Sequence, residues 1–270
     1  MNLTRLSFLA MTSSFLIALA MSPAMAADRL TDREVKGLIE QIDDNRDRFV
    51  DALDDKLKNN VLRTPKGEVD VKRYLDDFKE NIGRLKDRLK PEYAASAEAA
   101  AVLRQGVGIQ AFFRSQPPGT RGESEWNRLA TDLSVLAKAY GTTFPLDEKA
   151  SVRRVGDREL VTAAEAVAKT ADRLKKSVDN DLRTDVAVDR ASREAAVLEA
   201  EELGEAAKAL RDRVKDNKPS SAEAERLLAG ASKMQTFING RRMPSSSTVW
   251  VQAPAQLQTV AAAYGSAWPR

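Results

Sequence analysis

VKRYLDDFKENIGRLKDRL, residues 71–89, places apolar side chains at successive steps of 4, 3, 4, 3 and 4 residues. A repeat of about 3.5 residues is typical of a helix that packs at a shallow angle along another helix. Residues 196–214, AVLEAEELGEAAKALRDRV, have the same spacing with smaller side chains. The two stretches therefore predict equivalent helices, and the second should pack more closely against its neighbours.

The similarity extends well beyond these helices. Residues 30–145 align with residues 155–269 at an offset of 125, which falls to 124 after a one-residue deletion. The spacing from Trp to Tyr is the same in both copies, which favours internal duplication. The matched landmarks are Asp32-Arg33-Glu34 with Asp157-Arg158-Glu159, Asp47-Arg48 with Asp172-Arg173, Asp87-Arg88 with Asp212-Arg213, Ser96-Ala97-Glu98 with Ser221-Ala222-Glu223, Phe113 with Phe237, Trp126 with Trp250, and Ala139-Tyr140-Gly141 with Ala263-Tyr264-Gly265.

Each copy is predicted to contain four amphipathic helices and no strands, because apolar residues recur at three- and four-residue steps. The first helix should span residues 32–60, with Thr31 and Glu34 forming a capping box. The second should end before Pro91, or before Pro219 in the second copy. The third should begin at Ser96 or Ser221, with the serine as its N-cap.

The ends of the remaining segments carry turn residues. Residues 64–67, Thr-Pro-Lys-Gly, predict a turn. The fourth helix should end at Gly141 as a left-handed cap. In the second copy Pro254 should interrupt that helix, because proline suits a first turn and breaks a helix interior.

These features predict an all-α protein, a tandem duplication of an up-and-down four-helix bundle. A copy of about 115 residues is a suitable size for one bundle. We expect a signal peptide at residues 1–26, the first bundle at 27–146, a linker at 147–155 and the second bundle at 156–270.

The N-terminal residues favour export. Arg5 precedes an apolar stretch, residues 6–20, and Ala24-Met25-Ala26 fits an A-x-A cleavage site. We predict cleavage after Ala26 and a periplasmic or secreted mature protein of 244 residues. The alternative is a short membrane anchor, but the stretch is shorter than the roughly 20 residues that span a bilayer. No later segment is apolar enough to span, so no integral membrane segment is expected.

Charge is dense and balanced. The mature chain would hold 42 basic and 40 acidic residues, and basic blocks are not free of acidic neighbours. This pattern indicates solvated helix faces, and no nucleic-acid partner is expected. The oligomeric state is left open.

The sequence contains no histidine and no cysteine. This removes the commonest general base near neutral pH, the Ser-His-Asp and Cys-His arrangements, and the residues that attach haem or complete a ferritin-like iron site. Phosphate-binding glycine motifs are also absent, and Gly106-Val107-Gly108 is interpreted as a close helix contact. We predict no cofactor, no metal and no catalytic residues.

The strongest metal alternative is residues 43–54, which resemble an EF-hand calcium loop. The resemblance implies oxygen ligands at the first, third, fifth, ninth and twelfth positions of the loop. The sixth position, however, is Arg48 in place of glycine, and the twelfth is Asp54 in place of glutamate. The second copy has Ala168, Thr170 and Lys176 at ligand positions, so we expect a continuous surface helix in both copies.

Other charged pairs have simpler interpretations. Asp54-Asp55 and Asp76-Asp77 could in principle act as acid and base, but neighbouring helix positions point about 100° apart, which favours solvated faces. The repeated Asp-Arg dipeptides are interpreted as surface ion pairs, with contacts to a partner as the alternative.

Trp126 and Tyr140, like Trp250 and Tyr264, fall on one helix stripe. Core packing is the first interpretation, and a pocket mouth for an apolar ligand is the alternative. Trp268 should anchor the C-terminal segment.

The residue types lead to two hypotheses of function. The first is a non-enzymatic periplasmic or secreted scaffold or protein-interaction module, with an envelope protein as partner and duplication adding avidity. The second is a periplasmic small-molecule binding protein that uses the bundle interior. An enzyme ranks third.

Overall fold

The computed structural model describes residues 29–64, 67–147 and 149–268, which contain ten helices and two short strands. The chain is therefore mainly helical, as predicted. The first half contains α1 (Asp32–Ala52), α2 (Asp55–Lys58), β1 (Val61–Thr64), β2 (Gly67–Asp70), α3 (Val71–Arg88), α4 (Ser96–Arg114) and α5 (Glu123–Ala139). The second half contains α6 (Asp157–Arg183), α7 (Arg190–Lys215), α8 (Ser221–Asn239), α9 (Pro244–Trp250) and α10 (Pro254–Ala263).

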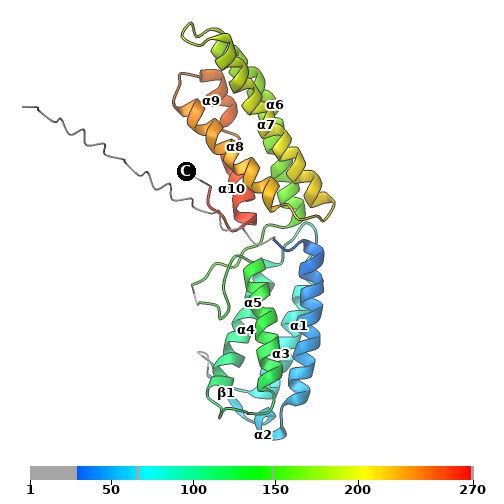
Figure 1. Ribbon diagram of the computed structural model, residues 1–270. Coiled ribbons are helices and arrows are strands. Elements are labelled where there is room, and N and C mark those ends of the chain that lie inside the picture. Colours follow the sequence, from blue (N-terminus) through cyan, green and yellow to red (C-terminus); the bar gives the residue numbers. More distant parts are fainter. Residues whose placement is uncertain (1–28, 65–66, 148, 269–270) are drawn as a thin grey trace, which may run out of the picture.

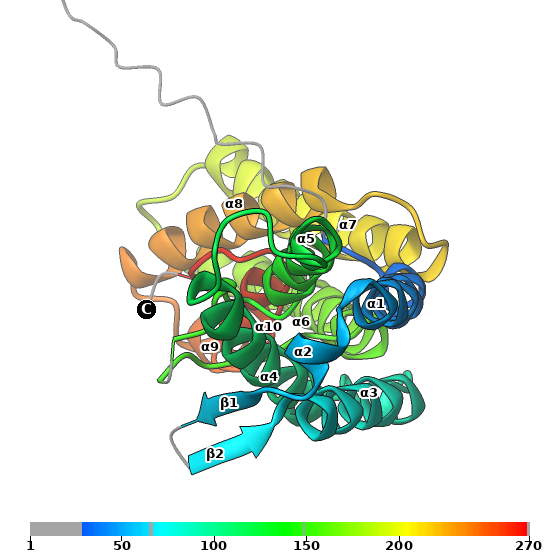
Figure 2. The same ribbon diagram turned by 90° about the horizontal axis from the view of Figure 1, so that it is seen from below.

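The two halves are stacked end to end, and each has its own buried apolar cluster (Figure 1). In the first half α1 packs against α3 and α5, while α4 packs against the same two helices on the other side. In the second half α6 packs against α7, α9 and α10, and α8 closes the ring. Figure 2 shows the long helices of the first half side by side, with the β-hairpin at their edge.

The seam positions form the core as predicted. Val71, Leu75, Phe78, Ile82 and Leu85 are all at most 3% exposed. Their counterparts on α7 are also buried, and α7 lies close to α6: a Cβ added at Gly204 would be 3.4 Å from the Cβ of Ala171. This close approach agrees with the smaller side chains of the second seam.

Several helix ends are confirmed. Thr31 and Glu34 form the capping box of α1, since the Thr31 hydroxyl accepts from the Glu34 N–H and the Glu34 carboxylate accepts from the Thr31 N–H. Gly141 has a φ of +67°, the left-handed conformation expected of the cap. α10 begins at Pro254.

The first predicted helix is too long, and the prediction of no strands is wrong. α1 ends at Ala52. The strands β1 and β2 form an antiparallel hairpin, in which Val61 is paired with Asp70 and Thr64 with Gly67. Asp54 instead caps α2 through the Leu57 N–H. The break after Ala52 allows the side chains of Leu57 and Leu62 to pack in the core, where they are 8% and 3% exposed. The middle of the predicted turn, residues 65–66, lies outside the described residues.

Ser96 and Ser221 are the first residues of their helices and not N-caps. The N-cap positions are Ala95, in the left-handed conformation, and Ser220. The Ser96 hydroxyl instead accepts a hydrogen bond from the Arg154 N–H, at 3.2 Å. The sequence did not show this competing partner, because Arg154 lies 58 positions away.

The one-residue deletion lies in the loop after α8. α4 and α8 have the same length and begin and end at an offset of 125. Phe113 therefore corresponds to Ile238, and both are buried, whereas Phe237 is only partly buried. The predicted match of Phe113 with Phe237 is corrected accordingly.

The segment predicted as a linker has no helix or strand among its described residues, but it is packed. Ala150 and Val152 pack against the core of the first half, and Val155 belongs to that of the second. Arg154 is 5% exposed. The predicted signal peptide lies outside the described residues. Trp268 packs against the second core, as expected for an anchor.

Asp181, near the end of α6, holds the start of α9 in place. Its carboxylate accepts hydrogen bonds from the N–H groups of Ser245 and Ser246 and from the Ser246 hydroxyl, at 3.3, 2.8 and 2.8 Å. Partial burial opposes ionisation, but the hydrogen bonds from Ser246 and Ser245 outweigh it and lower the pKa of Asp181. A carboxylate from one helix thus supplies the cap that α9 lacks in its own sequence.

Asp181→Asn should lower the free energy of unfolding at neutral pH by about 1 kcal/mol, the usual cost of losing a helix cap. Because the folded pKa is below the unfolded value, the stabilisation is present above that value and lost as the pH falls through the folded pKa. The wild type should therefore lose more stability than the variant between about pH 5 and pH 3, measured by urea unfolding. Asp172→Asn, on the exposed face of α6, is the control and should behave like the wild type. If the wild type and both variants lost the same free energy of unfolding between these pH values, Asp181 would not be the cap of α9.

Candidate functional site

A groove with a volume of about 770 Å³ lies between α7 and α8. Its floor includes two of the smallest residues, Ala206 on α7 and Gly230 on α8. Leu198 stands at one end and is 54% exposed. The full lining is Leu198, Glu199, Glu201, Glu202, Leu203, Glu205, Ala206, Ala209, Arg226, Ala229, Gly230 and Lys233. The groove thus has an apolar floor and one exposed apolar side chain.

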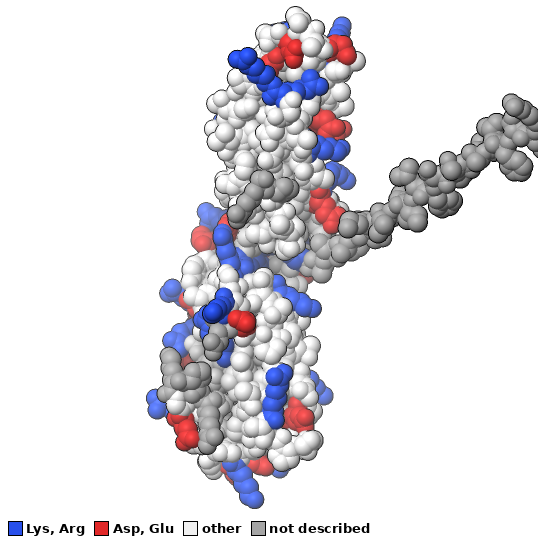
Figure 3. Space-filling model, turned by 90° about the vertical axis from the view of Figure 1, so that its left-hand side faces the viewer, with Lys and Arg blue, Asp and Glu red and all other residues white. Residues whose placement is uncertain are grey.

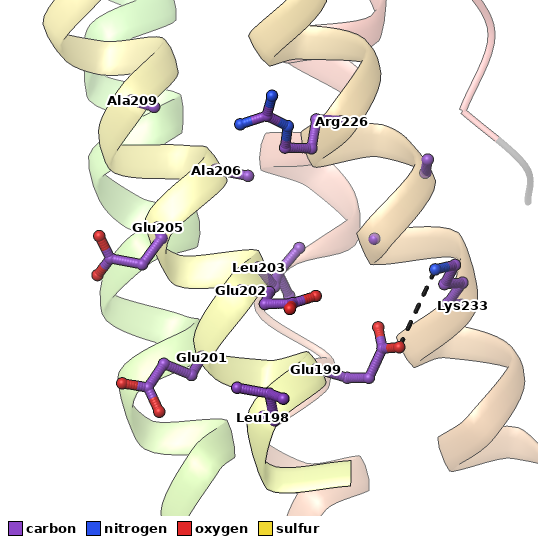
Figure 4. Close-up of a pocket in the computed structure, with 12 residues that line it drawn as sticks. Leu198, Glu199, Glu201, Glu202, Leu203, Glu205, Ala206, Ala209, Arg226 and Lys233 are labelled. Carbon is purple, nitrogen blue, oxygen red and sulfur yellow. Dashed lines mark ion pairs between the residues drawn. The ribbon is translucent and has the colours of Figure 1, made fainter. Parts of the chain in front are cut away.

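The two walls of the groove differ in charge (Figure 4). The α7 wall carries four glutamates, and the α8 wall carries Arg226 and Lys233. Lys233 lies 4.0 Å from Glu199 across the groove. Glu201 and Glu205 point away from α8, and pair with Lys175 and Lys208.

Two charges of the groove are without a partner in the part of the chain that the structure describes. Glu202 and Arg226 have no hydrogen-bond or ion-pair partner among the described residues. Both side chains are exposed. One unpaired negative charge therefore lies on the α7 wall and one unpaired positive charge on the α8 wall.

The corresponding surface of the first half is filled. At an offset of 125, Ala206 corresponds to Asn81 and Gly230 to Gln105. The Asn81 amide donates to the Gln105 side-chain oxygen at 2.5 Å, and the Tyr74 hydroxyl donates to the Gln105 carbonyl oxygen at 3.2 Å. Asn81 and Gln105 thus bridge α3 and α4 where the second half has Ala206 and Gly230. At the position of Tyr74 the second half has Glu199, which reaches Lys233 on α8.

Sequence reasoning did not identify this groove. The sequence does show that Ala206 and Gly230 stand where the first half has Asn81 and Gln105. This difference predicts a groove only once it is known that these two positions face each other on neighbouring helices. Gly106 and Gly108 are confirmed as close contacts, since an added Cβ would lie 2.7 Å from Leu133 Cδ1 and 2.3 Å from the Tyr74 hydroxyl oxygen.

The repeated aromatics lie in the cores. Trp126 is 3% exposed and packs against Phe49 and Phe113, with ring centroids 5.6 and 6.3 Å away. Tyr140 is fully buried and donates to the Ala94 carbonyl oxygen at 2.7 Å. Burial raises the pKa of this phenol. Core packing thus accounts for both residues.

The second pair of aromatics is similar. Trp250 is 5% exposed. The Tyr264 hydroxyl lies 2.7 Å from the Ser220 hydroxyl, and Tyr264 also lines a shallow groove at the junction of the two halves. Of these four residues only Tyr264 therefore reaches a described groove.

The calcium-loop segment is helical through Ala52, as expected from its apolar spacing. Asp47 pairs with Arg46 and Lys79, and Asp54 caps α2. Across the part of the chain that the structure describes, no group of three or more acidic residues is arranged to hold a metal ion. Asp76 is 66% exposed and lies 3.7 Å from Arg46, so it is a solvated surface carboxylate.

The most buried group of charges lies where the two halves meet. The Asp32 N–H donates to the Asp157 carboxylate at 2.8 Å, and the Asp157 N–H donates to the Asp32 carboxylate at 3.1 Å. Each aspartate is the first residue of its helix, α1 or α6. Each helix thus receives the carboxylate of the other at its N-terminus, where backbone N–H groups are free and negative charge is favoured.

Two arginines complete this arrangement in the same reciprocal way. Arg29 pairs with Asp157 at 2.5 Å and donates to the Val155 carbonyl oxygen at 2.8 Å. Arg154 pairs with Asp32 at 2.8 Å and donates to the Leu30 carbonyl oxygen at 2.8 Å. The two arginine side chains are 8% and 2% exposed. The predicted surface role of the Asp-Arg dipeptides is therefore wrong for Asp32 and Asp157, which bind the halves together.

Burial affects the charged forms in this junction. Burial raises the pKa of Asp32. The negative charge of Asp157 adds to this increase, while the positive charge of Arg154 acts in the opposite direction. Burial also lowers the pKa of Arg154, as does the nearby Arg29. Perturbed groups often mark reactive sites. Here, however, each charge is committed to a partner in the opposite half, which indicates a structural role.

Arg154→Ala should lower the free energy of unfolding by about 3 kcal/mol, because it removes one member of a buried ion pair and leaves the other unpaired. Urea unfolding followed by circular dichroism would measure the loss. Arg153→Ala is the matched control: its side chain is 70% exposed and pairs only with Glu159, so the change should cost less than about 0.5 kcal/mol. Equal effects of the two substitutions would contradict the role of Arg154.

Within the described residues, no helix has both the length and the hydropathy needed to cross a bilayer. Comparisons with protein-family models, curated proteins and solved structures found no match. The interpretation of the groove therefore rests on its own geometry and charge.

Proposed function

We propose that this chain is a tandem duplication of an up-and-down four-helix bundle that acts as a non-enzymatic protein-interaction module, with the groove between α7 and α8 as its interaction surface. One observation carries the proposal: Ala206 and Gly230 leave a hollow between walls that carry unpaired charges, whereas Asn81 and Gln105 fill the equivalent surface of the first half. A groove with an apolar floor between oppositely charged walls can receive an element of another protein, and complementary charges would select that partner.

Repeated contacts support the duplication. Arg88 pairs with Glu98 at 3.3 Å, and Arg213 pairs with Glu223 at 2.9 Å, each partner shifted by 125 positions. The exchange at the junction relates Arg29 to Arg154 and Asp32 to Asp157 by the same offset. In each half the tyrosine, Tyr140 or Tyr264, is followed by a glycine in the left-handed conformation, Gly141 or Gly265. Shared contacts of this kind are expected of one bundle copied once.

Charge argues for a protein partner over a nucleic acid. Basic and acidic side chains are interspersed on the face seen in Figure 3, and the groove itself has more acidic than basic residues. A nucleic acid would require a continuous basic surface. A protein can match both signs at once.

The alternative function, a small-molecule binder that uses the bundle interior, has weaker support. Large side chains fill the middle of the first core, among them Phe49, Phe78 and Tyr140, which are fully buried. In the second half Leu174, Leu210 and Leu257 are likewise fully buried. A ligand in either interior would have to displace these residues, at a cost in packing.

The proposed location is the periplasm or the extracellular space, on the strength of the sequence of residues 1–26. The chain purified from its natural source should begin at Ala27, because the A-x-A site directs cleavage after Ala26. N-terminal sequencing and the intact mass would measure this. Recovery of the whole chain with Met1 in the cytoplasmic fraction would contradict the proposed location.

Photocrosslinking in intact cells tests the interaction surface. A photoreactive amino acid at position 198 should give an adduct with another polypeptide, because Leu198 is exposed at the end of the groove. Position 73, the equivalent exposed position of the first half, is the matched control and should give at least about tenfold less adduct. Closing the groove by Ala206→Asn with Gly230→Gln should remove the adduct. The same yield at positions 73 and 198, or no adduct at either, would exclude the groove as the interaction surface.

A further inference from the structure

We infer that the groove between α7 and α8 binds an amphipathic α-helix of another protein, with basic residues on the flank that faces α7 and acidic residues on the flank that faces α8. This inference rests on the proposed function and adds the structure and chemistry of the occupant. It follows from the shape of the groove, from its unpaired charges and from the way in which the first half closes the same surface.

The shape of the groove fits a helix. It follows α7 from Leu198 to Ala209, a length of about 16 Å or three helical turns. The backbone N–H and C=O groups of α7 and α8 are used within these helices, so the groove offers no strand edge to an extended peptide. A helix can dock with apolar anchors at positions i, i+4, i+7 and i+11, which cover this length.

The floor allows close approach. Ala206 is 3% exposed, and a Cβ added at Gly230 would have only Leu203 Cδ1 within contact range, at 3.7 Å. Short side chains let another helix come near, while Leu198 projects beside it. The first half has Asn81 and Gln105 at the corresponding positions and fills this space itself.

The charges define the flanks of the occupant. Glu202 on the α7 wall and Arg226 on the α8 wall have no partners among the residues described. A helix with a basic flank and an acidic flank would pair both at once. A uniformly charged occupant, such as an anionic membrane surface or a nucleic acid, would meet one wall of its own sign.

Three designed helical peptides test the inference, with the same leucine anchors at i, i+4, i+7 and i+11. One has lysines on one flank and glutamates on the other, the second has lysines on both flanks, and the third has glutamates on both. The full chain should bind the mixed peptide about tenfold more tightly than either uniform peptide, measured by fluorescence anisotropy of labelled peptides at low salt. Reversing the direction of the mixed peptide exchanges its flanks, so one mixed sequence is sufficient.

Charge reversal of single wall residues should redirect the preference. Arg226→Glu replaces the unpaired positive charge of the α8 wall by a negative one, so the lysine peptide should become the tightest ligand. Glu202→Lys replaces the unpaired negative charge of the α7 wall by a positive one, so the glutamate peptide should gain most. An order of affinities that these two substitutions leave unchanged would overturn the inference, as would the absence of saturable binding of the mixed peptide up to about 1 mM, an affinity of about −4 kcal/mol.

The double substitution Ala206→Asn with Gly230→Gln provides a control that keeps the fold. It installs the side chains of the first half, and glutamine is a better helix former than glycine. Binding of the mixed peptide should fall at least about tenfold while the melting temperature stays the same or rises. Unchanged binding by this variant would place the peptide elsewhere and contradict the inference.

The experiments separate the two proposals. If Leu198 crosslinks to a partner in cells but the captured segment is not helical, the interaction function stands and the helical occupant is wrong. If neither a partner nor the mixed peptide is captured, both proposals fail.

Discussion

The reciprocal exchange of carboxylates between α1 and α6 is the constraint on which the arrangement of the molecule depends. Two helix N-termini point toward each other at the junction, and Asp32 and Asp157 each accept a hydrogen bond from the first helical N–H of the other half. Arg29 and Arg154 offset the two carboxylates and bind carbonyl groups across the junction. Because every charge of this cluster has its partner in the other half, stacking the halves satisfies groups that either half alone would leave unpaired.

Differences between the halves carry more information about function than their similarities. In the first half Asn81 and Gln105 close the face between α3 and α4. In the second half short residues at the same positions leave the face open, with Glu202 and Arg226 unpaired among the described residues. The proposed function accordingly assigns binding to the second half, where the face between α7 and α8 is hollow.

The helical fold and its cores could be predicted well from residue patterns, but several boundaries could not. The seam of α3 and the caps at Thr31 and Gly141 depend on neighbours in the sequence, and these predictions are confirmed. The end of α1 at Ala52, the strands β1 and β2, and the roles of Ser96 and Asp181 depend on distant groups. For example, Asp181 caps α9 from 65 positions away, a contact that no local pattern could indicate.

The sequence by itself determined the helical class, the repeat, and the absence of histidine and cysteine, because periodicity and composition are local properties of the chain. Only the tertiary structure decided which repeated residues meet. It brought Asp32 to Asp157, although their Asp-Arg motifs resembled ordinary surface pairs, and it placed Ala206 opposite Gly230 to form a groove. The physical reason is that a repeat defines equivalent positions, whereas the charges and volumes that face each other depend on how helices from distant parts of the chain are packed.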